Sequence, residues 1–448
     1  MTVRPDRLPT VRYLPLPAGW PLYALLGLFP VWWALGLGEF ILPLLALPMA
    51  VGIWRRRPVR VPRGFALWLL FLCWVAISVA ALNLEAPDTL SGDVATRTMA
   101  AGYRMVNYVA VTVVILYLGN LTEEELPKRR VVALLGVFFL QVVLLGCVAL
   151  LWPQGEFASP FELLLPESLR NNGFVSGLVH PQLAQNMAVL GDLSARPAAP
   201  FPYTNAWGNV TSVLLVWFVA WQWARRTTGH KVFAAVGVAV AAIPVIYSVN
   251  RGVWIGLLVA LVYVAARMAL RGNVRVLAGI VTAVVVGGAV IVATPLQGVV
   301  VERLNNPHSD QGRFAQDKVA VVGALHSPVI GYGSTRNMAG SRQSIAIGKS
   351  ASCPKCGNSS TGGAGHIWLL LFAHGFVGAA LYLGFFGYNL WRHRRDYTPI
   401  GVAASTVLVL SFVYLPFYGA IGMPLTLSFV AMGLLWRNAQ PAGEVVSS

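Results

Sequence analysis

The chain has 448 residues, of which 56% are hydrophobic and only 11% are charged. Soluble globular proteins carry roughly 25% charged residues, so the composition excludes a water-soluble globular protein of this length. The mean hydropathy is +0.65. Apolar runs of about 18–22 residues, the length that crosses a bilayer as a helix, recur along the chain and indicate an all-α polytopic membrane protein. A transmembrane β-barrel would show short alternating segments instead.

We expect about twelve transmembrane helices, which together make residues 1–448 a single transmembrane domain. Only Gly38-Glu39-Phe40 separates the first two runs. The runs lie at 20–36, 39–54, 65–82, 99–118, 131–152, 206–224, 232–247, 253–268, 276–293, 367–390, 401–415 and 421–436.

The net charge of +16 could indicate nucleic-acid binding, but the positions of the basic residues favour a different explanation. With the N-terminus in the cytoplasm, 21 of the 33 Lys and Arg residues fall at cytoplasmic positions, and every cytoplasmic loop is positive. This is the distribution that orients membrane proteins. We therefore expect both termini in the cytoplasm, membrane lipids around the helices and no nucleic-acid partner.

Two of the expected extracytoplasmic loops are too long to be simple connections. Residues 153–205 are rich in Pro, Asn and Gly, and residues 294–366 are polar and lie between the ninth and tenth predicted helices. Loops of this length are usually functional or disordered. The pattern at Phe314–Leu325 predicts a helix, so we expect the second loop to be partly helical and to carry active-site residues.

Three arginines are candidates for binding an anion. Arg251 stands in the very short connection Ser-Val-Asn-Arg-Gly-Val-Trp (248–254), where it either snorkels from a helix end or holds an anion. Arg313 opens the amphipathic pattern of the second long loop, and its planar guanidinium suits paired phosphate oxygens. Arg104 lies inside the fourth run near its outer end, where an anion contact and a structural pairing are both open.

His366 begins the tenth run after Gly-Gly-Ala-Gly and lies at the same expected depth as Arg251. A histidine at this place is either a polar helix end or a group that takes a proton from an acceptor hydroxyl near neutral pH. His374, about two turns deeper, is interpreted as a packing residue or as a support for the site.

Cys353-Pro-Lys-Cys356 lies in the second long loop. A local disulfide is expected there, because zinc would need two more ligands and an extracytoplasmic loop is oxidising. The sequence also lacks Asp-x-Asp, the phosphate-binding loop motif and His-Glu-x-x-His, so neither a metal nor a cofactor is expected.

In the order of these motifs, residues 205–390 resemble the O-antigen ligase and O-antigen polymerase superfamily of bacterial membrane glycosyltransferases. The matching segments are Asn250-Arg251-Gly252, Arg313 to Ala320, Ser327 to Gly333, and His366 followed by Gly375 to Gly378. The chain departs from the family in having Ile367 after the histidine and His374 directly before Gly375.

The resemblance implies an inverting, metal-independent transfer of a glycan from a polyprenyl (undecaprenyl-type) diphosphate carrier to an acceptor sugar hydroxyl. The reaction would take place at the extracytoplasmic face of the bacterial cytoplasmic membrane. Arg251 and Arg313 would bind and neutralise the diphosphate, and His366 would orient or deprotonate the glycan or glycolipid acceptor. Arg336, Arg342 and Arg104 are added to the expected diphosphate site without support from a motif.

A polytopic secondary transporter of a small anion or envelope precursor is the alternative from another class, because it also has about twelve helices. Transporters place polar residues on broken helices at mid-membrane, whereas here the apolar runs are nearly free of charge. The polar residues collect in the loops of one side instead.

Replacing both Cys353 and Cys356 with Ser is expected to reduce the order of the loop and to leave activity measurable, because the pair has no further metal ligands. Mass spectrometry of alkylated protein would report the disulfide, and elemental analysis would report zinc. Stoichiometric zinc, or a folded double variant without activity, would contradict this prediction.

Overall fold

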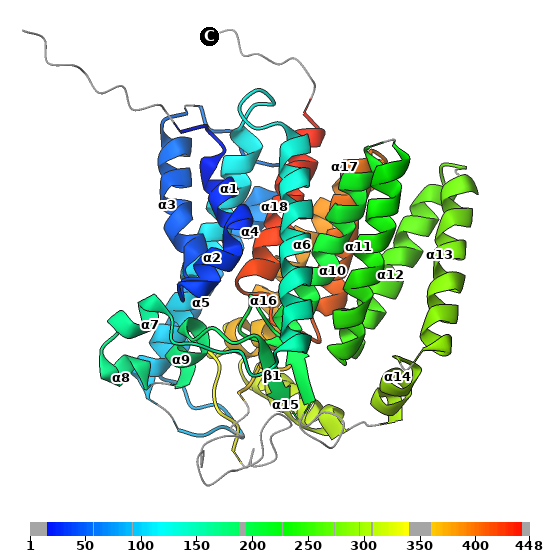
Figure 1. The fold of residues 1–448 in the computed structure, drawn as a ribbon. Helices are drawn as coiled ribbons and strands as arrows, with labels where there is room; N and C mark the ends of the chain where they lie inside the picture. Colours follow the sequence, from blue (N-terminus) through cyan, green and yellow to red (C-terminus); the bar gives the residue numbers. More distant parts are fainter. Residues whose placement is uncertain are drawn as a thin grey trace, which may run out of the picture.

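The structure, a computed structural model, describes residues 16–440 apart from 57, 92, 172, 188–193, 226, 273, 295, 306–307 and 340–359. It is mostly helical, and a helix lies at each range for which an apolar run predicts one (Figure 1). The first run forms two short helices. These elements are α1 Trp20–Gly27, α2 Phe29–Ala34, α3 Ile41–Trp54, α4 Phe65–Ser78 with the 3-10 turn Val79–Ala81, α5 Val94–Asn120, α6 Lys128–Leu151, α10 Thr204–Trp223, α11 Thr228–Tyr247, α12 Arg251–Ala269, α13 Val274–Ala293, α16 His366–Arg392, α17 Pro399–Tyr414 and α18 Met423–Asn438.

Five of these helices are long and apolar enough to cross a membrane, judged on the described residues: α5, α6, α11, α12 and α16. Shorter apolar helices, α3, α4 and α17 among them, accompany the five. The structure is therefore that of a helical membrane protein with little sheet. The count of about twelve crossing helices and the side on which the termini lie stay predictions.

The two long loops contain the remaining elements. The first holds three short helices and a hairpin in which β1 pairs antiparallel with β2. The second begins with α14 and α15, and α15 covers the helix expected over Phe314–Leu325. All of them gather at one end of the bundle, called the loop end here (Figure 1). Their bounds are α7 Pro160–Leu164, α8 Glu167–Arg170, α9 Gly173–Val179, β1 Ala184–Met187, β2 Ser194–Pro197, α14 Leu296–Asn305 and α15 His308–His326.

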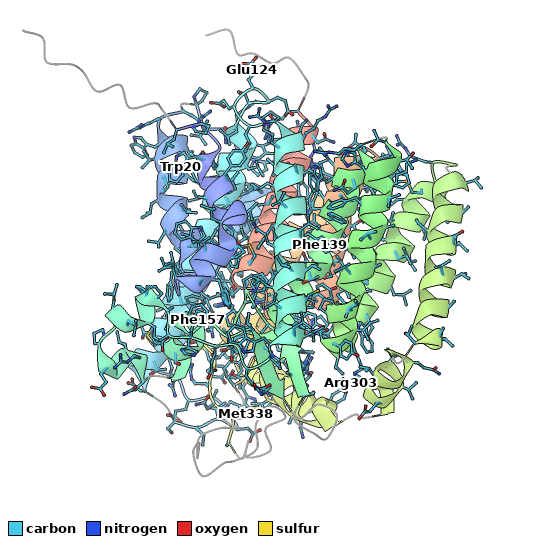
Figure 2. The ribbon with its side chains drawn as sticks, in the orientation of Figure 1. Trp20, Glu124, Phe139, Phe157, Arg303 and Met338 are labelled. Carbon is cyan, nitrogen blue, oxygen red and sulfur yellow. The ribbon has the colours of Figure 1, made fainter. Side chains whose placement is uncertain are left out.

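Side chains at the two ends of the bundle are separated by an apolar middle. In Figure 2, Phe157, Arg303 and Met338 lie at the loop end, Phe139 lies in the middle and Glu124 lies at the opposite end. In this middle layer α18 packs against α5, α10 and α17, and nearly all of its residues are buried. The core is therefore organised around the helix that comes last in the sequence.

Aromatic rings fill the core beside α18. The fully buried Trp68 lies against Phe429 of α18 at a ring-centroid distance of 4.7 Å and against Phe385 of α16 at 5.3 Å. Its indole N–H donates to Thr112 Oγ1 at 2.7 Å. A buried indole N–H needs such a partner, because an unpaired donor in an apolar interior is costly.

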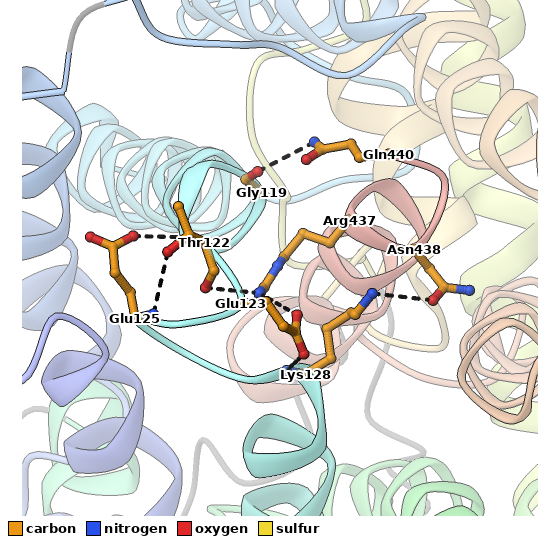
Figure 3. Close-up of polar contacts among 8 residues, drawn as sticks. All are labelled: Gly119, Thr122, Glu123, Glu125, Lys128, Arg437, Asn438 and Gln440. Carbon is orange, nitrogen blue, oxygen red and sulfur yellow. Dashed lines mark hydrogen bonds and ion pairs between the residues drawn. The ribbon is translucent and has the colours of Figure 1, made fainter. Parts of the chain in front are cut away.

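At the end opposite the loops, the α5–α6 connection binds the C-terminal end of α18 (Figure 3). The buried Arg437 donates from Nη2 to Glu123 Oε2 at 2.9 Å and to Thr122 O at 3.1 Å. Glu123 Oε1 in turn accepts the backbone N–H of Lys128 at the start of α6. One carboxylate thus ties α18 to α6.

Helix α16 is broken about a third of the way along from its first residue. Gly375 has a φ of 65°, and its neighbour Phe376 donates its N–H to Pro328 O at 2.7 Å. The Ser327–Gly333 turn fills the break, since Tyr332 N and Gly333 N donate to the carbonyls of Phe372 and Ala373. The short half-helix 366–374 therefore points into the loop end while the rest of α16 continues through the bundle.

Replacing Gly375 with Ala should destabilise the protein. An L-residue at positive φ costs about 1–2 kcal/mol, and the new Cβ would lie 2.5 Å from Val329 O. Thermal melting in detergent measures the loss. Gly384→Ala in the same helix is the matched control, because a Cβ there meets no atom within 4 Å. Equal melting temperatures for the two variants would contradict the proposed cause.

Candidate functional site

The connection between α17 and α18, residues 415–422, contacts Arg313, His366 and Asn250, the residue before Arg251. Arg313 Nη1 donates to Phe417 O at 3.3 Å, and the backbone N–H of His366 donates to Tyr418 O at 2.9 Å. The Tyr418 hydroxyl donates to the side chain of Asn250, the residue before Arg251. The 415–422 turn therefore joins α15, the start of α16 and the start of α12.

Two glycines allow these segments to approach so closely. A Cβ on Gly252 would collide with the Tyr418 hydroxyl, and a Cβ on Gly365 would collide with the backbone of Pro416. Any larger residue at either place would push its segment away from the turn. This explains why glycine follows Arg251 and precedes His366 in the sequence.

Two arginines that the sequence did not single out hold the segment before Arg251. Arg196, on β2, donates from Nε to Ser248 O at 2.5 Å, and Arg303, on α14, donates from Nε to Val249 O at 3.0 Å. Both side chains are buried, with about one-twentieth of their surface exposed. Arg196 comes from the first long loop and Arg303 from the second, so both long loops contact the segment 248–249 that precedes Arg251.

The backbone between the two accepting carbonyls is strained. Val249 has a φ of 53°, which is unusual for a β-branched residue and costs about 1–3 kcal/mol. Strain of this kind persists when the surroundings fix the conformation, and here two guanidinium groups bind the carbonyls of Ser248 and Val249. Arg251 follows as the half-buried first residue of α12.

Arginines gather at this site. The pKa of Arg196 is lowered to about 10, chiefly by burial; Tyr418 opposes the shift, and the charges of Arg303 and Arg313 add to it. The charges of Arg303 and Arg313 thus act on Arg196, and the hydrogen bonds described above join each of the three guanidinium groups to a backbone carbonyl. A carbonyl satisfies a donor without cancelling its charge, so these bonds bring positive charges from both long loops together.

His366 lies in an enclosed space beneath the 415–422 turn. Its side chain has no exposed surface, and its ring lies 5.1 Å from that of Tyr382 and 6.5 Å from that of Tyr108, measured between centroids. Among the described residues, neither ring nitrogen has a hydrogen-bond partner. A buried imidazole with both nitrogens unpaired is costly, which is typical of a group that receives a ligand or a water.

Arg104 reaches the same region from α5. Its two terminal nitrogens donate to Ser334 Oγ at 3.0 Å and Thr335 Oγ1 at 2.8 Å, and its charge acts on His366 and His374. His374 Nδ1 lies 2.7 Å from Ser78 Oγ, whereas its Nε2 has no partner. Arg104 thus borders the space around His366, and its hydroxyl partners leave its charge uncancelled.

Arg336 has a different place from the one predicted for it. Its buried guanidinium donates to four backbone carbonyls, those of Leu82, Tyr332, Ser334 and Thr335. Burial lowers its pKa to about 10. Through these hydrogen bonds Arg336 joins the 332–336 segment to Leu82, which follows α4 and its 3-10 turn. Both of its terminal nitrogens are already bonded, so the geometry favours a structural role over the predicted contact with a diphosphate.

Three predicted residues lie outside the described residues: Arg342, Cys353 and Cys356. Within the described part of the chain, no group of three His, Cys, Asp or Glu side chains could hold a metal ion. The signal that identified Arg251, Arg313 and His366 was their position next to glycines and helix starts. Arg196 and Arg303 carried no such signal, because their partners are carbonyls far away in the sequence.

Asp317, one turn after Arg313 on α15, gives the site a pH-dependent component. Burial raises the pKa of Asp317 to about 6, Arg313 opposes this shift, and its Oδ1 is buried without a hydrogen-bond partner. A pKa raised from the usual 3.8 means that this carboxyl stabilises the fold below about pH 4, and that the contribution is lost as the pH rises through about 6.

Asp317→Asn, which imitates the protonated carboxyl, should therefore melt above the wild type at about pH 8 and match it near pH 4. The difference should stay below about 1 kcal/mol, because the side chain is partly exposed and screened. Thermal melts of both proteins across this range measure it. A wild type that melts higher than the variant at about pH 8 would contradict the sign.

No family model matches this chain, and no curated protein matches it. The chemistry of the site is therefore argued from its own contacts. These contacts bring arginines from three segments and an enclosed histidine to two turns, 248–250 and 415–422, which the hydrogen bond between Tyr418 and Asn250 joins at the loop end of a helical membrane protein.

Proposed function

We propose that this protein is an inverting, metal-independent glycosyltransferase similar to the O-antigen ligases and polymerases. It moves a glycan from a polyprenyl diphosphate carrier to an acceptor sugar hydroxyl. The observation that carries this proposal is the meeting of Arg313, His366 and the segment before Arg251 on the 415–422 turn, with Arg196 and Arg303 beside it. The order of the sequence motifs adds to it.

The donor we infer is a lipid because the electropositive site lies at the end of apolar helices. The polyprenyl chain would lie in the bilayer beside the bundle, and its diphosphate would meet the arginines at the loop end. In this proposal the loop end faces the extracytoplasmic side of the bacterial cytoplasmic membrane, and about twelve helices cross with both termini in the cytoplasm.

Each residue has a defined part in the proposed reaction. The acceptor oxygen attacks the anomeric carbon from the side opposite the diphosphate, the bond from that carbon to the diphosphate oxygen breaks, and the configuration inverts. His366 takes the proton of the acceptor hydroxyl. Arg251 and Arg313 stabilise the charge that develops on the leaving diphosphate, which is often the largest contribution to catalysis.

One observation favours the alternative function, a secondary transporter of an anion. Helix α16 is broken at Gly375, and broken helices form the binding sites of many transporters. In this protein, however, the Ser327–Gly333 turn fills the break. A transporter would move an anion across liposomes without releasing polyprenyl diphosphate, so one assay separates the two functions.

Arg251→Lys should reduce kcat/KM about tenfold to a hundredfold, because lysine keeps the charge but loses the paired hydrogen bonds of a guanidinium. The assay supplies an undecaprenyl-diphosphate-linked glycan and measures the release of undecaprenyl diphosphate by purified protein. Arg394→Lys at the opposite end of the bundle is the control and should keep full activity. Wild-type turnover by a correctly folded Arg251→Lys protein would overturn the proposed role.

A further inference from the structure

A carboxylate that the mechanism does not use lies close to the same turn. Glu39 stands in the short connection between α2 and α3 at the loop end, and the Tyr103 hydroxyl donates to its Oε2 at 2.8 Å. Burial raises the pKa of Glu39, and the hydrogen bond from Tyr103 lowers it to a smaller extent. A half-buried carboxylate at the end of apolar helices is a functional candidate, since burying a charge is costly.

Glu39 lies beside the last residue of the 415–422 turn. Gly422 has a φ of 87°, and a Cβ on it would lie 3.1 Å from Glu39 Oε2. Arg313 and Asn250 contact the same turn at Phe417 and Tyr418. A basic and an acidic side chain therefore lie at different positions along one short segment. A diphosphate belongs near Arg313, because the Glu39 carboxylate would repel it.

A small pocket opens beside Glu39. Its walls are Trp33 of α2, the 38–39 connection, residues 177–181 and residues 200–202 of the first long loop. The cavity volume of about 20 Å³ holds one water or one hydroxyl group. Among the lining residues Glu39 is the only acid, and His180 is held by Glu162 at 2.9 Å. A carboxylate among an indole and three prolines suits a sugar, whose hydroxyls are polar and whose ring faces are apolar.

We propose that this pocket is part of the acceptor subsite: it admits one hydroxyl of a neutral acceptor sugar, which donates a hydrogen bond to the Glu39 carboxylate, while the sugar ring stays at the opening that Trp33 and the prolines of the first long loop border. This inference rests on the proposed function for the identity of the acceptor. It assigns residues 177–181 and 200–202 of the first long loop to acceptor binding, whereas Arg196 of the same loop lies with Arg303 and Arg313 at the donor site.

Steady-state kinetics separate the two sites. Glu39→Gln keeps the shape of the side chain but loses its charge, so the KM for the acceptor should rise roughly tenfold, the factor for one charge-assisted hydrogen bond. The KM for the lipid-linked donor should stay unchanged. Glu167→Gln, on the exposed α8 of the same loop, is the matched control and should change neither value. An unchanged KM for the acceptor in folded Glu39→Gln overturns the proposal.

Direct binding makes the test independent of turnover. Saturation-transfer NMR with the methyl glycosides of glucose, galactose, mannose and N-acetylglucosamine, without donor, should give signals that are lost in Glu39→Gln and reduced in Trp33→Leu. If Glu39→Gln does not fold, the signals of Trp33→Leu provide the test. No signal from any of the four sugars, or equal signals in wild type and variants, overturns the acceptor subsite.

The outcomes distinguish this inference from the proposed function. Sugar binding that depends on Glu39, in a protein that releases no polyprenyl diphosphate, would retain the subsite and reject the glycosyltransferase. Release of polyprenyl diphosphate with no dependence on Glu39 would retain the glycosyltransferase and reject the subsite.

Discussion

Buried guanidinium groups that donate to backbone carbonyls hold the loop end together. Arg196 and Arg303 bind the segment before Arg251, Arg313 binds the 415–422 turn, and Arg336 binds the segment after the Ser327–Gly333 turn. Each bond satisfies a donor and fixes a loop. The contacts that fold the loops thus also gather guanidinium groups at one end of the bundle, where the proposed function would use Arg313 to bind a diphosphate.

At the opposite end of the bundle two arginines pair with carboxylates, whereas the buried Arg267 donates to the carbonyl of Asp396. Arg56 forms a bidentate pair with Glu125 at 2.6 and 2.7 Å. Arg437 donates to Glu123 (Figure 3). There the carboxylate cancels the charge, so the contact joins helices without creating an anion site. Arginine therefore binds two kinds of partner in this protein: a carbonyl, which leaves its charge, and a carboxylate, which cancels it.

The sequence predicted the helices well and the site in part. Long, nearly charge-free runs mark helix positions because few other structures bury so much apolar surface, and each run contains a helix. The sequence did not predict the break in α16, because the apolar pattern continues across Gly375 and the turn that fills the break lies elsewhere in the chain.

Neighbouring glycines and expected helix starts pointed to Arg251, Arg313 and His366 as candidates. Arg196, Arg303 and Glu39 were missed because their importance depends on contacts between segments far apart in the chain.

The central position of α18 bears on how the protein is made. Almost every residue of this helix is buried between α5, α10 and α17, yet it is synthesised after all three. Until it packs into the bundle, the aromatic side chains that later lie against it, including Trp68, have lipid or each other as partners. The connection that precedes α18 is also the 415–422 turn, so the packing of α18 fixes the turn as it fills the core. A nascent chain halted before residue 415 would contain both long loops but neither the turn nor α18.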